Sequence, residues 1–239
     1  MSMPTESITR PVSVEPDRVR EMFDRISPSY DRMNRLMSLG MDGRWRGRAV
    51  REAALTPGDT ALDVCCGTGD LAIALRRAVG PSGRVTGLDF SPQMLEVARR
   101  KSDQVEWVQG DALELPFADG GFAAATVAWG VRNLADHERG FREMARVVRE
   151  GGRVVCLEMS TPPAWAAPFA RIWTDRAVPL LGRAIARDAD AYSYLPESVR
   201  RFPDAPGLAA VMRAAGLEDV RFRRLMLGVV AVHVGTVPA

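Results

Sequence analysis

Short apolar segments alternate with amphipathic segments along the middle of the chain, and this alternation restricts the fold most strongly. Strands are predicted at residues 60–65, 84–89, 105–111, 122–130 and 151–160. Helices are predicted at residues 71–79, from Ser91 onward, and at 136–148. Strands and helices that alternate at this spacing form βαβ units, whose right-handed crossovers build a doubly wound parallel sheet.

Both ends of the chain add to this pattern. Residues 18–39 are predicted to be helical with a break at Pro28, and residues 44–55 form a second predicted helix. Near the C-terminus a helix is predicted at 207–216, followed by two strands within 220–237 that form a hairpin at the sheet edge. We therefore expect an α/β fold with a Rossmann-like, seven-stranded sheet that is mostly parallel and has a C-terminal antiparallel strand.

The chain length of 239 residues suits one large domain. Residues 1–17 are polar and contain proline, so we expect a flexible N-terminal segment there. Residues 18–239 are expected to form the single domain. Within it, 18–55 would be lid helices and 161–203 an insertion on the substrate side.

Composition excludes several classes of protein. The net charge of +2 is too small to favour nucleic-acid binding. Three cysteines, two of them adjacent, argue against a disulfide framework and for the cytoplasm. No run of 18 apolar residues is present, so no membrane span is expected, and the first residues lack an apolar h-region, so no signal peptide is expected. The two histidines lack metal-ligand spacing, so no metal is expected.

The stretch LDVCCGTGD at residues 62–70 is a glycine-rich loop that follows a strand. Gly67 and Gly69 fit the dinucleotide-binding fingerprint, and Asp89 lies where a ribose-binding acid belongs. Asp63 and Asp70 flank the glycines, however, and Asp70 in the first helical turn would repel a pyrophosphate. A cofactor of positive charge fits this loop better.

S-adenosylmethionine has no phosphate and carries both a sulfonium and an ammonium group. Asp63 or Asp70 would then lie near the amine, Asp89 near the ribose hydroxyls, and Asp111 near the adenine amino group. All of these acids stand at the ends of successive predicted strands, where ligands bind in open α/β sheets. Each of them also has a purely structural interpretation, as a helix cap or a turn residue.

Eight segments spread along the chain are distinctive: MFDRISPSYDRMNRLMSLGMDGRW (22–45), LDVCCGTGDLA (62–72), GLDFSPQML (87–95), GDALELPF (110–117), GVRNLAD (130–136), GGRVVCLEMSTP (151–162), DADAYSYLPESVRRFP (188–203) and GVVAVHVGT (228–236). Through these motifs the sequence resembles the ubiquinone/menaquinone biosynthesis C-methyltransferases, which are class I methyltransferases. The resemblance covers about Val19 to Val237. It implies S-adenosylmethionine as cofactor and carbon methylation of a polyprenyl quinol.

Site residues follow from the loop and from the resemblance together. The expected cofactor-binding residues are Asp63, Gly67, Thr68, Gly69, Asp89, Phe90, Asp111 and Ala112. The expected catalytic residues are Arg132, Asn133 and Tyr30. Arg132 would stabilise a phenolate or orient a water, Asn133 would bond a quinol oxygen, and Tyr30 would line the pocket or touch the cofactor.

Menaquinol is the expected product, made from demethylmenaquinol; a ubiquinol precursor or another aromatic acceptor is the alternative. Two alternative functions belong to other classes of protein: a NAD-dependent oxidoreductase and a non-catalytic assembly factor for quinone synthesis. An aromatic and aliphatic stripe flanked by arginines at 165–183 predicts peripheral contact with the inner face of the cell membrane. Packing of that stripe on the core or in a homodimer is the other interpretation.

Overall fold

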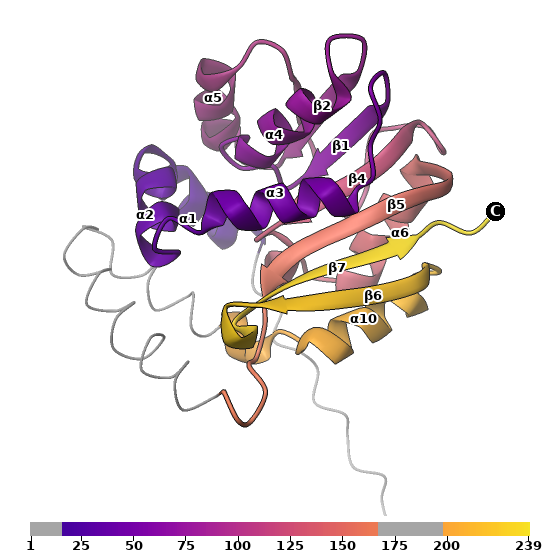
Figure 1. Ribbon diagram of the computed structural model, residues 1–239. Helices are drawn as coiled ribbons and strands as arrows, with labels where there is room; N and C mark the ends of the chain where they lie inside the picture. Colours follow the sequence, from indigo (N-terminus) through magenta and orange to yellow (C-terminus); the bar gives the residue numbers. More distant parts are fainter. Residues whose placement is uncertain (1–15, 167–197) are drawn as a thin grey trace, which may run out of the picture.

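A computed structural model describes residues 16–166 and 198–239 and contains one seven-stranded sheet in the order β3-β2-β1-β4-β5-β7-β6 (Figure 1). Its strands are β1 (Thr60–Val64), β2 (Arg84–Asp89), β3 (Glu106–Gln109), β4 (Phe122–Ala128), β5 (Val148–Met159), β6 (Glu218–Leu225) and β7 (Val230–Thr236). Neighbouring strands from β3 through β5 pair in parallel. The predicted doubly wound sheet is therefore confirmed.

The reversed strand is β7, which pairs antiparallel with both β5 and β6. The C-terminal hairpin of β6 and β7 was predicted from the sequence, and it is present. Of these two strands, β6 forms the sheet edge, and β7 lies between β5 and β6. This arrangement is the mostly parallel sheet with an antiparallel C-terminal strand that the sequence predicts.

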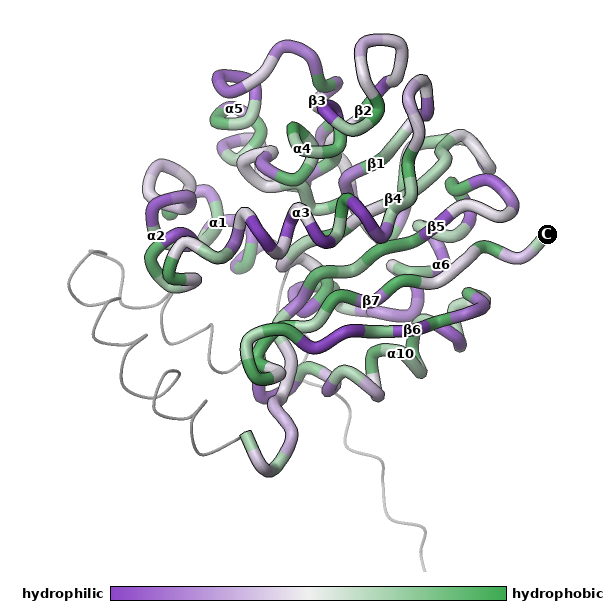
Figure 2. The backbone as a smooth tube through the Cα atoms, viewed as in Figure 1, coloured by the Kyte–Doolittle hydropathy of each residue, from purple (hydrophilic) through white to green (hydrophobic). Residues whose placement is uncertain are grey.

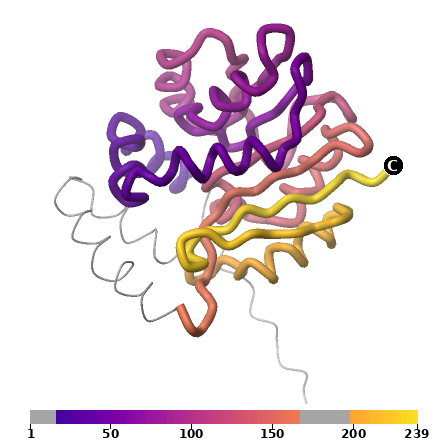
Figure 3. The backbone as a smooth tube through the Cα atoms, viewed as in Figure 1, coloured from indigo at the N-terminus to yellow at the C-terminus, as the bar shows by residue number. Residues whose placement is uncertain are grey.

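Helices cover both faces of the sheet (Figure 3). They are α1 (Pro16–Ile26), α2 (Tyr30–Met37), α3 (Asp42–Glu52), α4 (Asp70–Val79), α5 (Pro92–Lys101), α6 (His137–Val147) and α10 (Ala205–Ala214). Short 3-10 helices connect other elements: η1 (Ser27–Ser29), η2 (Val131–Asn133) and η4 (Met226–Gly228). The break predicted at Pro28 is η1, which separates α1 from α2.

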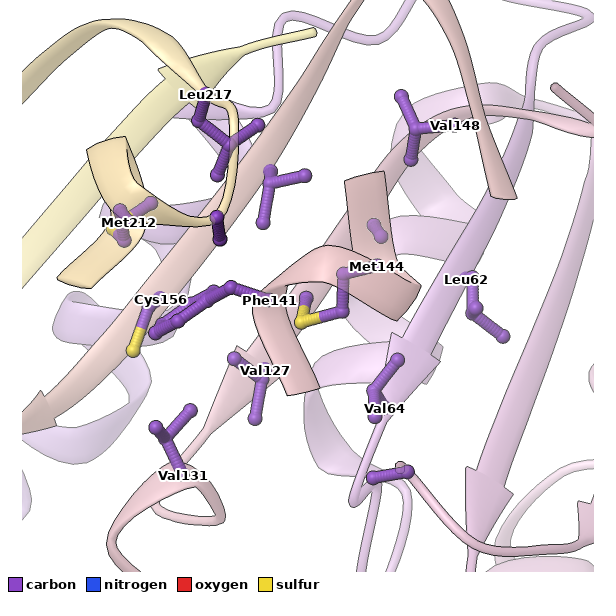
Figure 4. Packing of buried hydrophobic residues seen from close by; sticks show 14 of the residues in the cluster. Leu62, Val64, Val127, Val131, Phe141, Met144, Val148, Cys156, Met212 and Leu217 are labelled. Atoms are coloured by element: carbon purple, nitrogen blue, oxygen red, sulfur yellow. The ribbon is translucent and has the colours of Figure 1, made fainter. Parts of the chain in front are cut away.

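The strands divide their apolar residues between two cores, as the period of two in a strand requires. On β1, Ala61 belongs to the cluster formed with α3 and α4, whereas Leu62 belongs to the cluster formed with α6 and α10. In the second cluster Phe141, Met144 and Met212 pack against β4 and β5 (Figure 4). Green segments accordingly predominate in the central strands in Figure 2, with hydrophilic residues at a few positions of β1 and β5.

Two predicted features lie largely outside the described residues: the flexible segment at 1–17, of which the structure describes Pro16 and Asp17, and the stripe at 165–183, of which it describes Trp165 and Ala166. Over the described ranges, no helix is both long and apolar enough to span a membrane.

Candidate active site

A pocket lies at the carboxyl ends of the parallel strands, beside the adjacent strands β1 and β4. At this point the chain leaves β1 toward β2 on one side of the sheet and leaves β4 toward β5 on the other. Ligands bind at this position in open α/β sheets. The pocket encloses about 790 Å³ of space, part of it open to solvent. Its lining comes from the loops after β1 to β4 and from the N-terminal helices, and it includes Val19, Phe23, Tyr30, Cys65, Gly67, Asp89, Phe90, Asp111, Ala112, Ala128, Trp129, Gly130, Asn133 and Leu134.

The two glycines of the loop serve different purposes. Gly67 lines the pocket in a left-handed conformation (φ +53°), and a Cβ there would lie 3.8 Å from the Tyr30 ring. Gly69 also has positive φ (+84°), but a Cβ there would lie 2.3 Å from Trp107. Gly67 thus leaves the backbone accessible from the pocket, whereas Gly69 is required by packing against β3.

Asp89, the last residue of β2, joins the glycine loop to the next turn. One carboxylate oxygen accepts a hydrogen bond from the Gly67 amide at 2.8 Å, and the other accepts from the Ser91 amide at 2.9 Å. The side chain is buried, and burial raises its pKa to about 6 against the lowering effect of these amides. Asp89 therefore shapes the pocket wall and presents a carboxylate to it.

Asp63 lies one layer behind the pocket lining. It is buried in β1, where Oδ1 accepts a hydrogen bond from the Thr126 hydroxyl at 2.8 Å. Burial raises its pKa to about 7, and the Thr126 hydroxyl and the Ala72 amide partly offset this rise. Since Ala72 belongs to the first turn of α4, Asp63 supports the glycine loop from beneath.

Thr68 and Asp70 have partners outside the pocket. The Thr68 hydroxyl donates to Asp31 of α2 at 2.5 Å. The Asp70 carboxylate pairs with Lys101 at 2.7 Å and with Arg46 at 3.3 Å. Asp70 is therefore outside the pocket lining, with its carboxylate held by two cations from α3 and α5. Its place near the cofactor amine stays a prediction.

Asp111, Ala112 and Phe90 meet in the pocket as predicted from their places after β3 and β2. Asp111 lines it while its Oδ1 also accepts from the Leu113 amide at 2.9 Å, which fixes the turn. Phe90 packs edge-on against Phe23 of α1, with ring centroids 6.4 Å apart. The N-terminal helices thus close one side of the pocket, which supports their interpretation as a lid.

The three expected catalytic residues are not all brought together. Tyr30 and Asn133 line the pocket, and burial raises the pKa of the Tyr30 phenol, so it keeps its proton at neutral pH. Arg132 is not among the lining residues. Its guanidinium lies 2.8 Å from Glu158 and donates to the Trp129 carbonyl.

Left-handed backbone at two pocket positions, and a buried carboxylate behind the pocket, were not predicted from the sequence. Cys65 (φ +53°) and Trp129 (φ +62°) adopt left-handed backbone conformations at the ends of β1 and β4, and both line the pocket. Such conformations are costly for residues other than glycine and concentrate at functional sites. Glu158 is the one carboxylate in the apolar run VVCLEM, a signal that could have identified it.

The charge of the pocket indicates which cofactor it fits. Among the lining residues that the structure describes, Asp89 and Asp111 carry the formal charges, and both are negative. A pyrophosphate would meet two carboxylates without a cation, which opposes dinucleotide binding. S-adenosylmethionine, with its positive sulfonium and ammonium groups, suits this lining.

Comparison with known proteins gives the same answer. The model of the ubiE/COQ5 methyltransferase family matches residues 12–237. The demethylmenaquinone methyltransferase of Thermus thermophilus is 46% identical over 222 residues, which cover 91% of this chain and 100% of that protein. The enzyme of that name from Desulfitobacterium hafniense is 43% identical and covers 92% of this chain and 90% of its own.

Solved structures support the fold. The cyclase SpnF superposes with a TM-score of 0.71 at 18% identity, over 96% of this chain and 98% of its own. An S-adenosylmethionine-dependent methyltransferase from Thermotoga maritima has a TM-score of 0.65 at 20% identity, over 90% and 98% of the two chains. The sheet order, the acidic pocket and the family match together show that this chain belongs to the ubiE/COQ5 methyltransferase family and uses S-adenosylmethionine.

Proposed function

We propose that this enzyme methylates a ring carbon of demethylmenaquinol to give menaquinol. The observation that carries the proposal is a pocket whose two charges are acidic and whose remaining lining is mainly apolar. The acidic part suits the cationic cofactor and the apolar part suits a naphthoquinol ring. The relatives named demethylmenaquinone methyltransferase support this acceptor over a ubiquinol precursor.

The acidic part and the apolar part of the pocket contain residues with different proposed roles. Gly67, Asp89, Phe90, Asp111 and Ala112 hold the cofactor, with Asp89 on the ribose hydroxyls and Asp111 on the adenine amino group. Asp63, Thr68 and Gly69 keep the loop in shape from outside the pocket. Bound S-adenosylmethionine supplies an electrophilic methyl group, so the remaining residues must orient the acceptor and exclude water.

On the acceptor side, Tyr30 and Asn133 are the polar lining residues beside Trp129 and Leu134. The protonated Tyr30 phenol and the Asn133 amide donate hydrogen bonds to the two quinol oxygens and so stabilise negative charge on them. Arg132 lies outside the lining and supports it indirectly, through its hydrogen bond to the Trp129 carbonyl. The reacting ring carbon would take the methyl group as the bond between methyl and sulfur breaks and S-adenosylhomocysteine is released. The same carbon would then lose its hydrogen as a proton to water, which restores the aromatic ring.

The reduced ring is essential to this proposal, because an oxidised quinone is electron-poor and does not attack an electrophile. Purified enzyme with methyl-labelled S-adenosylmethionine and short-tailed demethylmenaquinol should put label into the organic phase. The oxidised demethylmenaquinone and a ubiquinol precursor serve as controls. Equal labelling of the ubiquinol precursor would change the proposed acceptor, and no labelling despite tight cofactor binding would refute methylation of a quinol.

The polyprenyl tail of the proposed substrate lies in the membrane. We therefore propose that the enzyme is cytoplasmic and contacts the inner face of the cell membrane through residues 165–183. Trp165, the first residue of this stripe, has 70% of its surface exposed, which supports the proposal. Flotation with anionic liposomes should carry the wild type upward and Trp165→Ser less. A homodimer on size exclusion that is lost in Trp165→Ser, without flotation, would instead assign this residue to a subunit interface.

A further inference from the structure

Glu158 is a fully buried carboxylate in β5, close to the pocket but outside its lining. Its side chain has 0% exposure. Oε1 lies 2.8 Å from Nη1 of Arg132 and also accepts from the Met159 amide at 2.8 Å. A buried charge needs such partners, because the interior solvates it poorly.

Arg132 connects this carboxylate to the pocket wall. Its side chain is 8% exposed, and the same Nη1 donates to the Trp129 carbonyl at 2.5 Å. The Asn133 amide nitrogen lies 3.4 Å from that carbonyl. A continuous chain of polar contacts therefore runs from Glu158 through Arg132 to the turn that places Trp129 and Asn133 in the pocket.

The turn needs this support because its backbone is unfavourable. Trp129 has a φ of +62°, a conformation that persists in a large residue only when its surroundings hold it. Its amide is fixed to the Leu157 carbonyl at 3.0 Å, and its ring packs edge-on against Trp45. Arg132 supplies the hydrogen bond on the carbonyl side.

We infer that Glu158 is a positioning residue for methyl transfer: it holds Arg132 on the Trp129 carbonyl and thereby sets Trp129 and Asn133 against the acceptor. The inference rests on the proposed function, since it assigns this wall to the quinol. It also changes the role of Arg132, whose guanidinium is engaged by Glu158 rather than presented to a phenolate. Glu158 acts on the acceptor side, so cofactor affinity is independent of it.

The competing explanation is that the Arg132–Glu158 pair serves folding alone, with each buried charge neutralising the other and neither holding the turn at Trp129. The double variant Arg132→Met/Glu158→Leu separates the two, because a buried ion pair can often be replaced by apolar residues without loss of stability. Neutralisation alone predicts that the double variant regains full activity. If the pair positions the turn, the double variant should fold but no longer hold Trp129 and Asn133 against the acceptor.

The experiment compares the wild type, Glu158→Gln, the double variant and Glu52→Gln. Glu52 is the matched control, a largely buried glutamate that pairs with Arg48 and Arg221 away from the pocket. The readouts are melting temperature, Kd for S-adenosylmethionine, kcat and KM for reduced demethylmenaquinol, and hydrogen exchange of the amides of residues 129–134.

The double variant should keep its melting temperature and cofactor Kd, while kcat falls by about tenfold or more and exchange at 129–134 becomes faster. Wild-type kcat and wild-type exchange in the double variant would overturn the inference. If the wild type itself transfers no methyl group to the quinol, the proposed function fails instead. Hydrogen exchange then still decides whether Glu158 holds the turn.

Discussion

The Thr68 hydroxyl donates a hydrogen bond of 2.5 Å to the Asp31 carboxylate and so ties the glycine loop to helix α2. A second link of the same kind joins the Ser91 hydroxyl to Asp24 of α1, also at 2.5 Å. Both hydroxyls belong to turns that border the pocket. The N-terminal helices are therefore attached to the cofactor loops by two hydroxyl–carboxylate bonds, in addition to the packing of Phe23 on Phe90.

Removal of the first link should loosen the lid. Thr68→Val keeps the shape of the buried side chain and leaves Asp31 paired with Lys101. The loss of one charge-assisted hydrogen bond, about 1–2 kcal/mol, predicts a rise of about 5- to 30-fold in the Kd for S-adenosylmethionine, measured by calorimetry. Hydrogen exchange in α1 and α2 should be faster. Thr60→Val, which loses a hydrogen bond to the Gly121 carbonyl elsewhere, is the control and should bind normally.

The ligand-free enzyme should lose stability as pH rises, through Asp63. Burial raises the pKa of this carboxyl to about 7, against about 3.9 in an unfolded chain. Between these values the folded chain holds a proton that the unfolded chain has released, so the free energy of unfolding falls as pH rises through this window.

The expected loss from Asp63 between pH 6 and pH 8 is about 1 kcal/mol, or about 2–4 °C in melting temperature for a chain of this size. Asp63→Asn should lack this part of the decline. Melting curves of both proteins at the two pH values measure it. An identical decline in the wild type and the variant would contradict the assignment of the raised pKa to Asp63.

The turns that follow β1 and β4 approach each other so closely that no side chain fits at Gly130. A Cβ at this position would lie 2.4 Å from Cβ of Cys65. Gly130→Ala should therefore destabilise the protein by about 1–3 kcal/mol and reduce methyl transfer. Gly43→Ala, where no atom lies within 4 Å of the added Cβ, should leave the melting temperature unchanged or slightly raised.

A second substitution tests the cause of that effect. Cys65 has a φ of +53°, which glycine adopts without strain, so Cys65→Gly removes both the opposing atoms and an unfavourable conformation. Gly130→Ala combined with Cys65→Gly should recover most of the lost melting temperature. Failure to recover would mean that another contact of Gly130 is responsible.

The charge of Asp111 should matter for the cofactor and not for the fold. Asp111→Asn keeps an oxygen that can accept from the Leu113 amide, so the turn remains and the melting temperature should hold. The Kd for S-adenosylmethionine should rise by about 5-fold, the equivalent of about 1 kcal/mol. Glu114→Gln removes a charge from the same loop outside the lining. An equal rise of the Kd in that variant would mean that the total negative charge of the loop matters, and not a contact of Asp111 with the cofactor.

Local patterns in the sequence were sufficient to predict the sheet and the strand ends at which the ligand binds. Periodicity and turn residues are short-range signals, and they located each parallel strand and the break at Pro28. Asp89 at the end of β2 and Asp111 after β3 line the pocket, as the sequence predicts, because parallel strands bring their carboxyl ends to one edge. The order β5-β7-β6 at the antiparallel end depended on long-range pairing that no local signal records.

The sequence by itself determined the fold class, the family and the acidic character of the cofactor loop. Only the tertiary structure decided which polar groups face the pocket and which are already bound. Asp70 meets Lys101 across 31 residues, Thr68 meets Asp31 across 37, and Arg132 meets Glu158 across 26. Such pairs form when packed helices and strands bring polar groups from distant segments together, and their energy depends on desolvation and geometry rather than on spacing along the chain.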